Sequence, residues 1–118
     1  MDIFDIVLAE QKKILNSGFK WPGRKEAINK VQEELLELLE AFDLKDEQKI
    51  KEEFGDLLLI VTTLSLYLKL DLKSCLADAF EKFEGRYKSM KILSSKRGVT
   101  FSKLSSEMKS ALWVEVKK

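Results

Sequence analysis

Histidine is absent from this chain of 118 residues, and cysteine and proline each occur once. Without histidine there can be no Ser-His-Asp or Cys-His catalysis and no imidazole ligand for a metal. Any chemistry must therefore come from carboxylates, lysine, arginine or a bound metal ion. The lone cysteine, Cys75, cannot form a disulfide within the chain, so we expect a cytoplasmic location.

An excess of charge of one sign is also missing, because 21 Lys and Arg stand against 20 Asp and Glu, for a net charge of +1. This balance argues against a general nucleic-acid-binding protein. The first five residues contain two acids, Asp2 and Asp5, and no basic residue, so no signal peptide is expected. The longest stretch without a charged side chain, residues 57–68, is shorter than the roughly 20 apolar residues that span a bilayer, so no membrane partner is expected.

Strand patterns and internal repeats are absent as well, whereas apolar residues recur at helical spacing in five segments. The predicted fold is all-α, a bundle of four to five helices in a single domain over residues 1–118. The expected helices cover residues 2–16, 24–43, about 47–69, about 72–94 and about 106–117. The expected end signals are Gly18 after the first helix, the N-caps Asp46, Asp71 and Ser105, and a polar loop over 94–100.

The segment 53–69 is expected to be the central helix of the bundle. Leu, Ile and Val occupy nearly every face after Asp56, which predicts a helix buried on all sides. One short chain does not easily cover such a helix, so we expect a homo-oligomer, a homodimer or a dimer of dimers, with a dimer favoured.

The segment 24–43 is expected to turn a stripe of apolar residues toward the core and to keep its acids at the edge. The stripe consists of Ile28, Val31, Leu35, Leu38, Leu39 and Phe42. A second row beside it consists of Lys30, Glu34, Glu37 and Ala41. Glu34 and Glu37 should therefore border the core, whereas Glu33 and Glu40 should point to solvent.

Two acidic pairs at a spacing of three residues, Glu34/Glu37 and Glu53/Asp56, carry the most chemical information. They would face each other if the second and third helices formed an antiparallel hairpin. Four converging carboxylates need a counter-charge, and Mg²⁺ or Mn²⁺ with oxygen ligands is the natural one. Lys82 and Arg86, one helical turn apart, could then hold phosphates, and Trp113 or Trp21 could offer a flat surface to a base.

Together these motifs resemble the MazG family of all-α nucleoside triphosphate pyrophosphohydrolases. The signature ExxE…ExxD is matched by Glu34-x-x-Glu37 and Glu53-x-x-Asp56. Gly18-Phe19-Lys20-Trp21-Pro22, the segment 81–86 and the C-terminal segment 112–117 resemble further parts of the catalytic MazG domain. The resemblance extends over most of the chain.

The resemblance implies hydrolysis of nucleoside triphosphates to the monophosphate and pyrophosphate, with removal of unwanted nucleotides as the biological role. It implies that Glu34, Glu37, Glu53 and Asp56 bind Mg²⁺ and form the catalytic group. It further implies substrate contacts from these residues: Lys30, Glu33, Lys82, Arg86, Trp113 and Lys117. Glu33, Glu34 and Glu37 all remain candidates for the general base.

Position 80 departs from the family, where many relatives carry asparagine and this chain has Phe80. This difference leaves open a nucleotide-binding regulator that holds the metal without turnover. A second alternative is a helical interaction module, because ExxE pairs and Lys/Arg pairs are common on solvated helix faces.

Overall fold

The computed structural model describes residues 1–118 and contains only helices. In order along the chain they are α1 (Ile3–Asn16), α2 (Arg24–Asp43), α3 (Glu47–Leu68), α4 (Leu72–Lys96), the 3-10 turn η1 (Phe101–Lys103) and α5 (Ser106–Lys117). The all-α prediction is confirmed. No helix is both long enough and apolar enough to cross a membrane.

Several of the predicted helix ends are confirmed by their caps. The carboxylate of Asp46 accepts a hydrogen bond from the Lys49 amide (3.1 Å), and the Ser105 hydroxyl accepts one from the Met108 amide (3.1 Å). Gly18 follows α1 with φ of +99°, a left-handed conformation that glycine adopts without steric cost. The sequence predicts a loop that begins at residue 94, but α4 continues to Lys96. Ser94 is buried within α4, and its hydroxyl donates to the Val99 carbonyl (2.6 Å).

The chain divides into two compact units, Met1–Leu72 and Lys73–Lys118, which are described separately. The first unit contains α1, α2 and α3, and the second contains nearly all of α4 together with η1 and α5.

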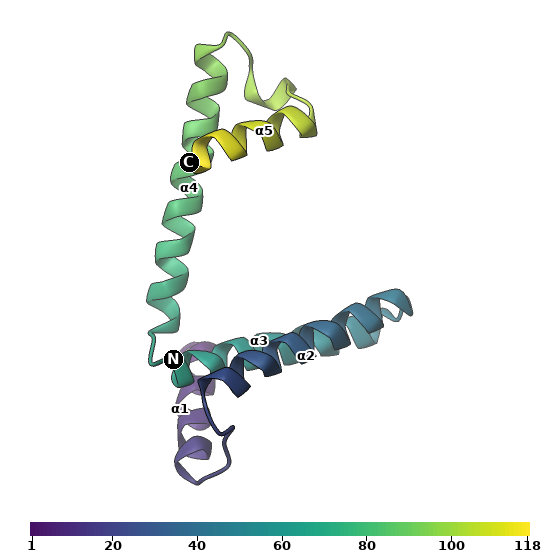
Figure 1. Cartoon of the computed structure of the whole chain (residues 1–118), viewed down its shortest axis with the longest axis vertical. Coiled ribbons are helices and arrows are strands. Elements are labelled where there is room, and N and C mark those ends of the chain that lie inside the picture. Colours follow the sequence, from purple (N-terminus) through teal and green to yellow (C-terminus); the bar gives the residue numbers. More distant parts are fainter. The chain divides into compact units, whose positions relative to one another are not determined.

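Helices α2 and α3 form an antiparallel hairpin, which is the main packing contact of the first unit (Figure 1). The face of α2 that packs on α3 carries Ala27, Glu34 and Ala41, all buried and spaced by seven residues. Small side chains at both ends of this row let the two backbones approach closely. The expectation that the leucine stripe faces the core is therefore wrong for the single chain: Leu35, Leu39 and Phe42 are more than half exposed.

The prediction that α3 is buried on all sides is also wrong for the single chain. Its buried residues are Thr62, Thr63 and Ser65, whereas Phe54 and Leu58 remain about half exposed. The three buried hydroxyls are satisfied within the helix, because they donate to the carbonyls of Leu58, Leu59 and Thr62 at 2.7–2.8 Å. The buried residues of α3 are thus small and polar, whereas Phe54, Leu58, Leu59 and Val61 are exposed.

Helix α1 crosses the hairpin at the end where α3 finishes (Figure 1). Gln11 on α1 donates to the Thr63 hydroxyl of α3 (2.8 Å). In the connector that follows α1, the Trp21 amide donates to the Tyr67 hydroxyl (2.9 Å). Arg24 donates to the last carbonyls of α3, those of Tyr67 (3.1 Å) and Leu68 (2.9 Å), and so caps that helix with a positive charge.

In the second unit α5 folds back across α4 (Figure 1). Each helix buries one large apolar side chain, Met90 on α4 and Leu112 on α5. The guanidinium of Arg97, directly after α4, forms a two-pronged ion pair with the Glu115 carboxylate of α5 (2.7 and 3.0 Å).

Candidate metal centre

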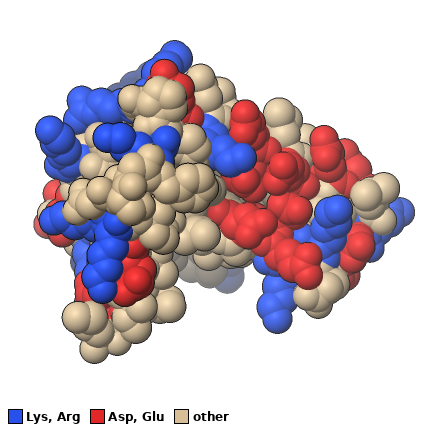
Figure 2. All heavy atoms as spheres, turned by 90° about the horizontal axis from the view of Figure 1, so that it is seen from below, with Lys and Arg blue, Asp and Glu red and all other residues tan.

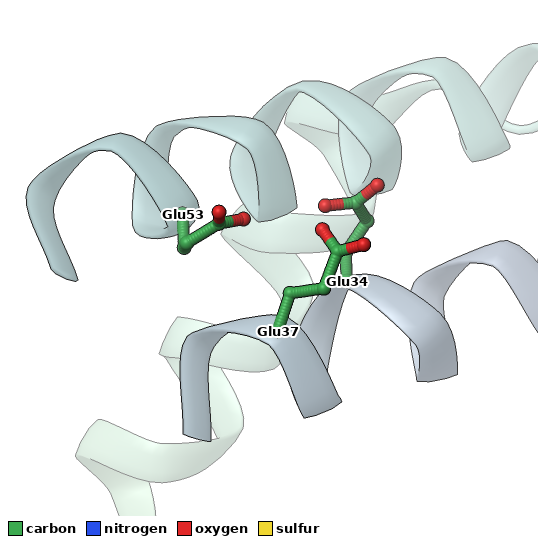
Figure 3. Close-up of side chains that lie close together, drawn as sticks. All are labelled: Glu34, Glu37 and Glu53. Carbon is green, nitrogen blue, oxygen red and sulfur yellow. The ribbon is translucent and has the colours of Figure 1, made fainter. Parts of the chain in front are cut away.

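Three glutamates from the α2–α3 hairpin converge on one point. Glu34 and Glu37 project from α2 and Glu53 projects from α3, and the three carboxylates turn toward one another between the helices (Figure 3). One carboxylate oxygen from each lies within 4.8 Å of the other two. Around an octahedral Mg²⁺ ion, adjacent ligands are about 3 Å apart and opposite ligands about 4 Å apart, so these side chains would have to move closer together for all three to bind one ion.

Burial distinguishes this cluster from a solvated acidic face. Glu34 is only 7% exposed, and Glu53 is half-buried. One oxygen of each, Oε2 of Glu34 and Oε2 of Glu53, is buried without a hydrogen-bond partner. Because a buried carboxylate oxygen without a partner is costly, these two atoms fit a site that a hard cation completes.

Lys30, one turn before Glu34 on α2, partly neutralises the cluster. Its ammonium lies 3.2 Å from Glu33 Oε2 and 3.5 Å from Glu34 Oε1. The hydrogen bond to Glu33 is the main cause that raises the pKa of Lys30, so this side chain stays charged. One ammonium cannot balance three carboxylates, which leaves the cluster with a net negative charge.

The pKa of Glu34 is raised above the ordinary glutamate value. Burial is the largest cause, because it penalises the charged form, and the neighbouring Glu37 carboxylate adds to the shift. Lys30 acts in the opposite direction. Ionisation of Glu34 is therefore costly without metal, and a bound cation would offset that cost.

The other acids predicted for the site lie outside this group. Asp56, three residues after Glu53 on α3, is exposed and does not join the three-glutamate cluster. Glu33 is exposed and paired with Lys30. Acidic side chains gather on the surface over the hairpin (Figure 2). Metal binding by Asp56 and a substrate contact by Glu33 stay predictions.

Three of the cations predicted to contact the substrate lie in the second unit, whereas Lys30 lies in the first. Lys82 and Lys117 are exposed, and Arg86 is half-buried on α4. The Arg86 guanidinium lies 5.7 Å from the centre of the Trp113 ring, and the Phe83 ring lies 5.2 Å from the same ring. Arg86 and Trp113 thus form one contact pair, and their roles toward a nucleotide stay predictions.

Sequence reasoning placed Ala41 in the row of Glu34 and Glu37 but gave it no packing role, and it missed Ala27. Ala27 and Ala41 are fully buried, seven residues before and after Glu34. Their regular spacing around an acid was visible in the sequence as a small-residue row at helical period. The Arg97–Glu115 pair was also missed, and its 18-residue separation carries no local signal.

The MazG nucleotide pyrophosphohydrolase domain matches residues 23–91 of the chain. This chain belongs to the MazG family. The matched region of the MazG domain includes the three clustered glutamates, Asp56, Lys82 and Arg86, whereas α1 and α5 lie outside it.

Similar proteins extend the relationship beyond the matched region. The chain is 37% identical over 107 residues to a nucleoside triphosphate pyrophosphohydrolase/pyrophosphatase MazG of Thermotoga maritima, covering 91% of this chain and 41% of that protein. It is 33% identical over 110 residues to a nucleoside triphosphate pyrophosphohydrolase of Escherichia coli K12, covering 92% of this chain and 42% of that protein. The chain thus spans about two fifths of the length of the curated relatives it matches.

Proposed function

We propose that this MazG domain hydrolyses nucleoside triphosphates to nucleoside monophosphate and pyrophosphate, with Mg²⁺ as cofactor and Mn²⁺ as a possible substitute. The observation that carries the proposal is the cluster of Glu34, Glu37 and Glu53, with its two buried oxygens that lack a partner. The names of the Thermotoga maritima and Escherichia coli relatives supply the reaction.

In this proposal Glu34, Glu37 and Glu53 hold the divalent cation, and Asp56 is the fourth ligand. The cation, when bound, supplies positive charge that offsets the carboxylates and the phosphate oxygens. Lys30, Lys82 and Arg86 contribute further positive charge toward the triphosphate. Trp113 offers its ring to the base. Lys117, which lies on α5 with Trp113, is a further substrate contact in this proposal.

The proposed reaction is a displacement at the α-phosphorus. A water oxygen forms a bond to the α-phosphorus, and the bond from that phosphorus to the bridging oxygen of the β-phosphate breaks. Pyrophosphate leaves with the bridging oxygen and its electron pair. A proton of the water passes to one of Glu33, Glu34 and Glu37, of which Glu33 and Glu37 are exposed and can release it to solvent.

We also propose that a second copy of the chain covers the outward apolar faces of the hairpin. These exposed side chains include Leu35, Leu36, Leu39 and Phe42 on α2 and Phe54, Leu58, Leu59 and Val61 on α3. Monomeric proteins rarely leave a row of large apolar side chains in water. The proposed assembly is a homodimer. We also propose a housekeeping role in clearing unwanted nucleotides, and a cytoplasmic location.

A panel of NTPs and dNTPs incubated with Mg²⁺, with monophosphate and pyrophosphate quantified, tests the reaction. We expect both products in equal amounts, and label at the γ-phosphate should appear in pyrophosphate. Glu53→Gln should abolish turnover, whereas Glu40→Gln, an exposed change on α2, should not. Label appearing mainly as free orthophosphate would overturn the assignment, and nucleotide binding without any product would favour a regulator.

A further inference from the structure

The contact between α4 and α5 depends on long side chains rather than on close backbone packing. Helix α5 has only 12 residues and buries one side chain, Leu112. A helix of this length is marginal by itself and needs tertiary contacts to stay folded and in place. Its position and its rotation about its own axis are therefore determined by the few side chains that reach α4.

Two arginines on one side of α4, Arg86 and Arg97, contact side chains of α5. Arg86 and Arg97 are 11 residues apart, close to three full turns, so they lie on the same face and about 16 Å from each other along the axis. Arg97 follows the last residue of α4, and its amide still donates to the Leu93 carbonyl (3.1 Å), which preserves the helical register.

The partners of the two arginines lie on opposite sides of α5. Trp113 and Glu115 are two residues apart, so their side chains project in nearly opposite directions from the helix. Arg86 lies over the Trp113 ring at 5.7 Å, and Arg97 forms its two-pronged ion pair with Glu115 at 2.7 and 3.0 Å. Contacts on both flanks oppose rotation of α5 in either direction.

We propose that Arg97 and Glu115 are positioning residues that hold Trp113 against Arg86 and so orient the Arg86 guanidinium for the triphosphate. This inference rests on the proposed function, because the readout is phosphate binding. Arg97 and Glu115 are both about half exposed, and exposed ion pairs usually add little to stability. Their paired geometry instead restricts orientation, which is the property that two parallel charge-assisted hydrogen bonds provide. The pKa of Glu115 is lowered by its hydrogen bonds to Arg97, so the pair stays ionised at neutral pH.

Binding of inorganic tripolyphosphate with Mg²⁺, measured by titration calorimetry, tests the proposal without involving a base. We expect Arg86→Ala to weaken binding by at least about tenfold. Arg97→Ala and Glu115→Ala should each weaken tripolyphosphate binding by about threefold, because these residues act on Arg86 only through Trp113. In the Arg86→Ala background, Arg97→Ala should have no further effect.

Two comparisons separate positioning from a long-range effect of charge. Lys88→Ala removes one positive charge from α4 and breaks an exposed ion pair with Glu84 (3.7 Å), so it is the matched control and should leave binding unchanged. Exchanging the partners, Arg97→Glu with Glu115→Arg, should restore binding. If Arg97→Ala weakened binding while Glu115→Ala strengthened it, charge alone would explain the data and the proposal would be wrong.

Trp113 fluorescence gives a readout that does not depend on phosphate binding. In a Trp21→Phe background, acrylamide should quench Trp113 more strongly after Arg97→Ala or Glu115→Ala, and the exchanged pair should reverse this change. Unchanged quenching in both variants would overturn the proposal. A wild-type chain that binds no tripolyphosphate would instead refute the proposed function, so the two failures are distinguishable.

Discussion

Glu34 is the residue on which the chemistry of the hairpin depends. It is buried between two helices, close to two other carboxylates, and only Lys30 offers it a positive charge. Burial raises its pKa above the ordinary glutamate value, because burial penalises the charged form. A group with a raised pKa stabilises the fold below its unfolded pKa and loses that contribution as pH rises through the folded value.

We therefore expect the free energy of unfolding without metal to fall as pH rises above the ordinary glutamate range. Glu34→Gln should remove this part of the pH dependence, because glutamine stays neutral. At pH 7 without metal the variant should be more stable than the wild type. Urea denaturation at several pH values, with EDTA present, measures this difference.

Adding Mg²⁺ should reverse the order of stability. A cation that binds only the folded protein stabilises it in proportion to the logarithm of its concentration above Kd. The wild type should therefore melt higher with Mg²⁺, whereas Glu34→Gln should respond weakly and lose at least about 100-fold in activity. An equal response to Mg²⁺ in both proteins would show that the cluster does not bind the ion.

Asp56 gives a second test at this scale, because it is exposed and outside the three-glutamate cluster. If it is the fourth ligand, Asp56→Ala should abolish activity while changing stability without metal by less than about 0.5 kcal/mol, as is usual for exposed positions. Glu40→Ala, also exposed, is the control and should keep activity within a small factor. Similar losses in the two variants would mean that activity depends on general acidity rather than on this position.

At the scale of elements, small residues share a face of α2 with Glu34, seven residues before it and seven after it. Ala27 and Ala41 are fully buried on α2, and the buried residues of α3 are the small Thr62, Thr63 and Ser65, of which Thr63 contacts Gln11 of α1. Large apolar side chains at these positions would separate the helices and with them the carboxylates of Glu34 and Glu53. The distance between α2 and α3 therefore also determines the distance between the carboxylates of Glu34 and Glu53.

Ala41→Leu should destabilise the protein by roughly 1–3 kcal/mol, the usual cost of overpacking a tight interface. It should also weaken Mg²⁺ binding, because α2 and α3 would move apart. Ala77→Leu places the same side chain at an exposed site on α4 and should leave both quantities nearly unchanged. Thermal unfolding with and without Mg²⁺ measures both effects, and an undisturbed Mg²⁺ shift in Ala41→Leu would contradict the packing argument.

At the scale of the whole molecule, the chain exposes more apolar surface than a stable monomer usually does. The leucines of α2 were expected in the core, yet Leu35 and Leu39 are 54% and 53% exposed. A second copy that buries these faces would explain why the sequence maintains such a stripe.

Sedimentation should therefore show a dimer or larger assembly at micromolar concentration. Leu39→Glu places a charge in the proposed interface and should shift the protein toward monomer by at least about tenfold in dissociation constant. Leu70→Glu is the matched control, because Leu70 is equally exposed (53%) but lies in the turn after α3. A wild-type monomer at these concentrations would refute the proposed assembly.

The sequence by itself determined the elements of this protein. Helical periodicity and the caps at Asp46 and Ser105 placed helices at nearly their observed bounds, because these signals act within a few residues along the chain. The spacing of the two acidic pairs identified α2 and α3 as the helices that carry the candidate site. Local rules were sufficient for all of these predictions.

Only the tertiary structure decided which face of each helix is buried. A long apolar stripe looks like a core to sequence reasoning, but the buried positions of α2 and α3 in the structure are small residues and Glu34, and most of the stripe is exposed. The same packing joined Glu53 to Glu34 and Glu37 and left Asp56 outside the cluster. The Arg97–Glu115 pair was likewise invisible in the sequence, because it depends on how α5 lies across α4 and not on any spacing along the chain.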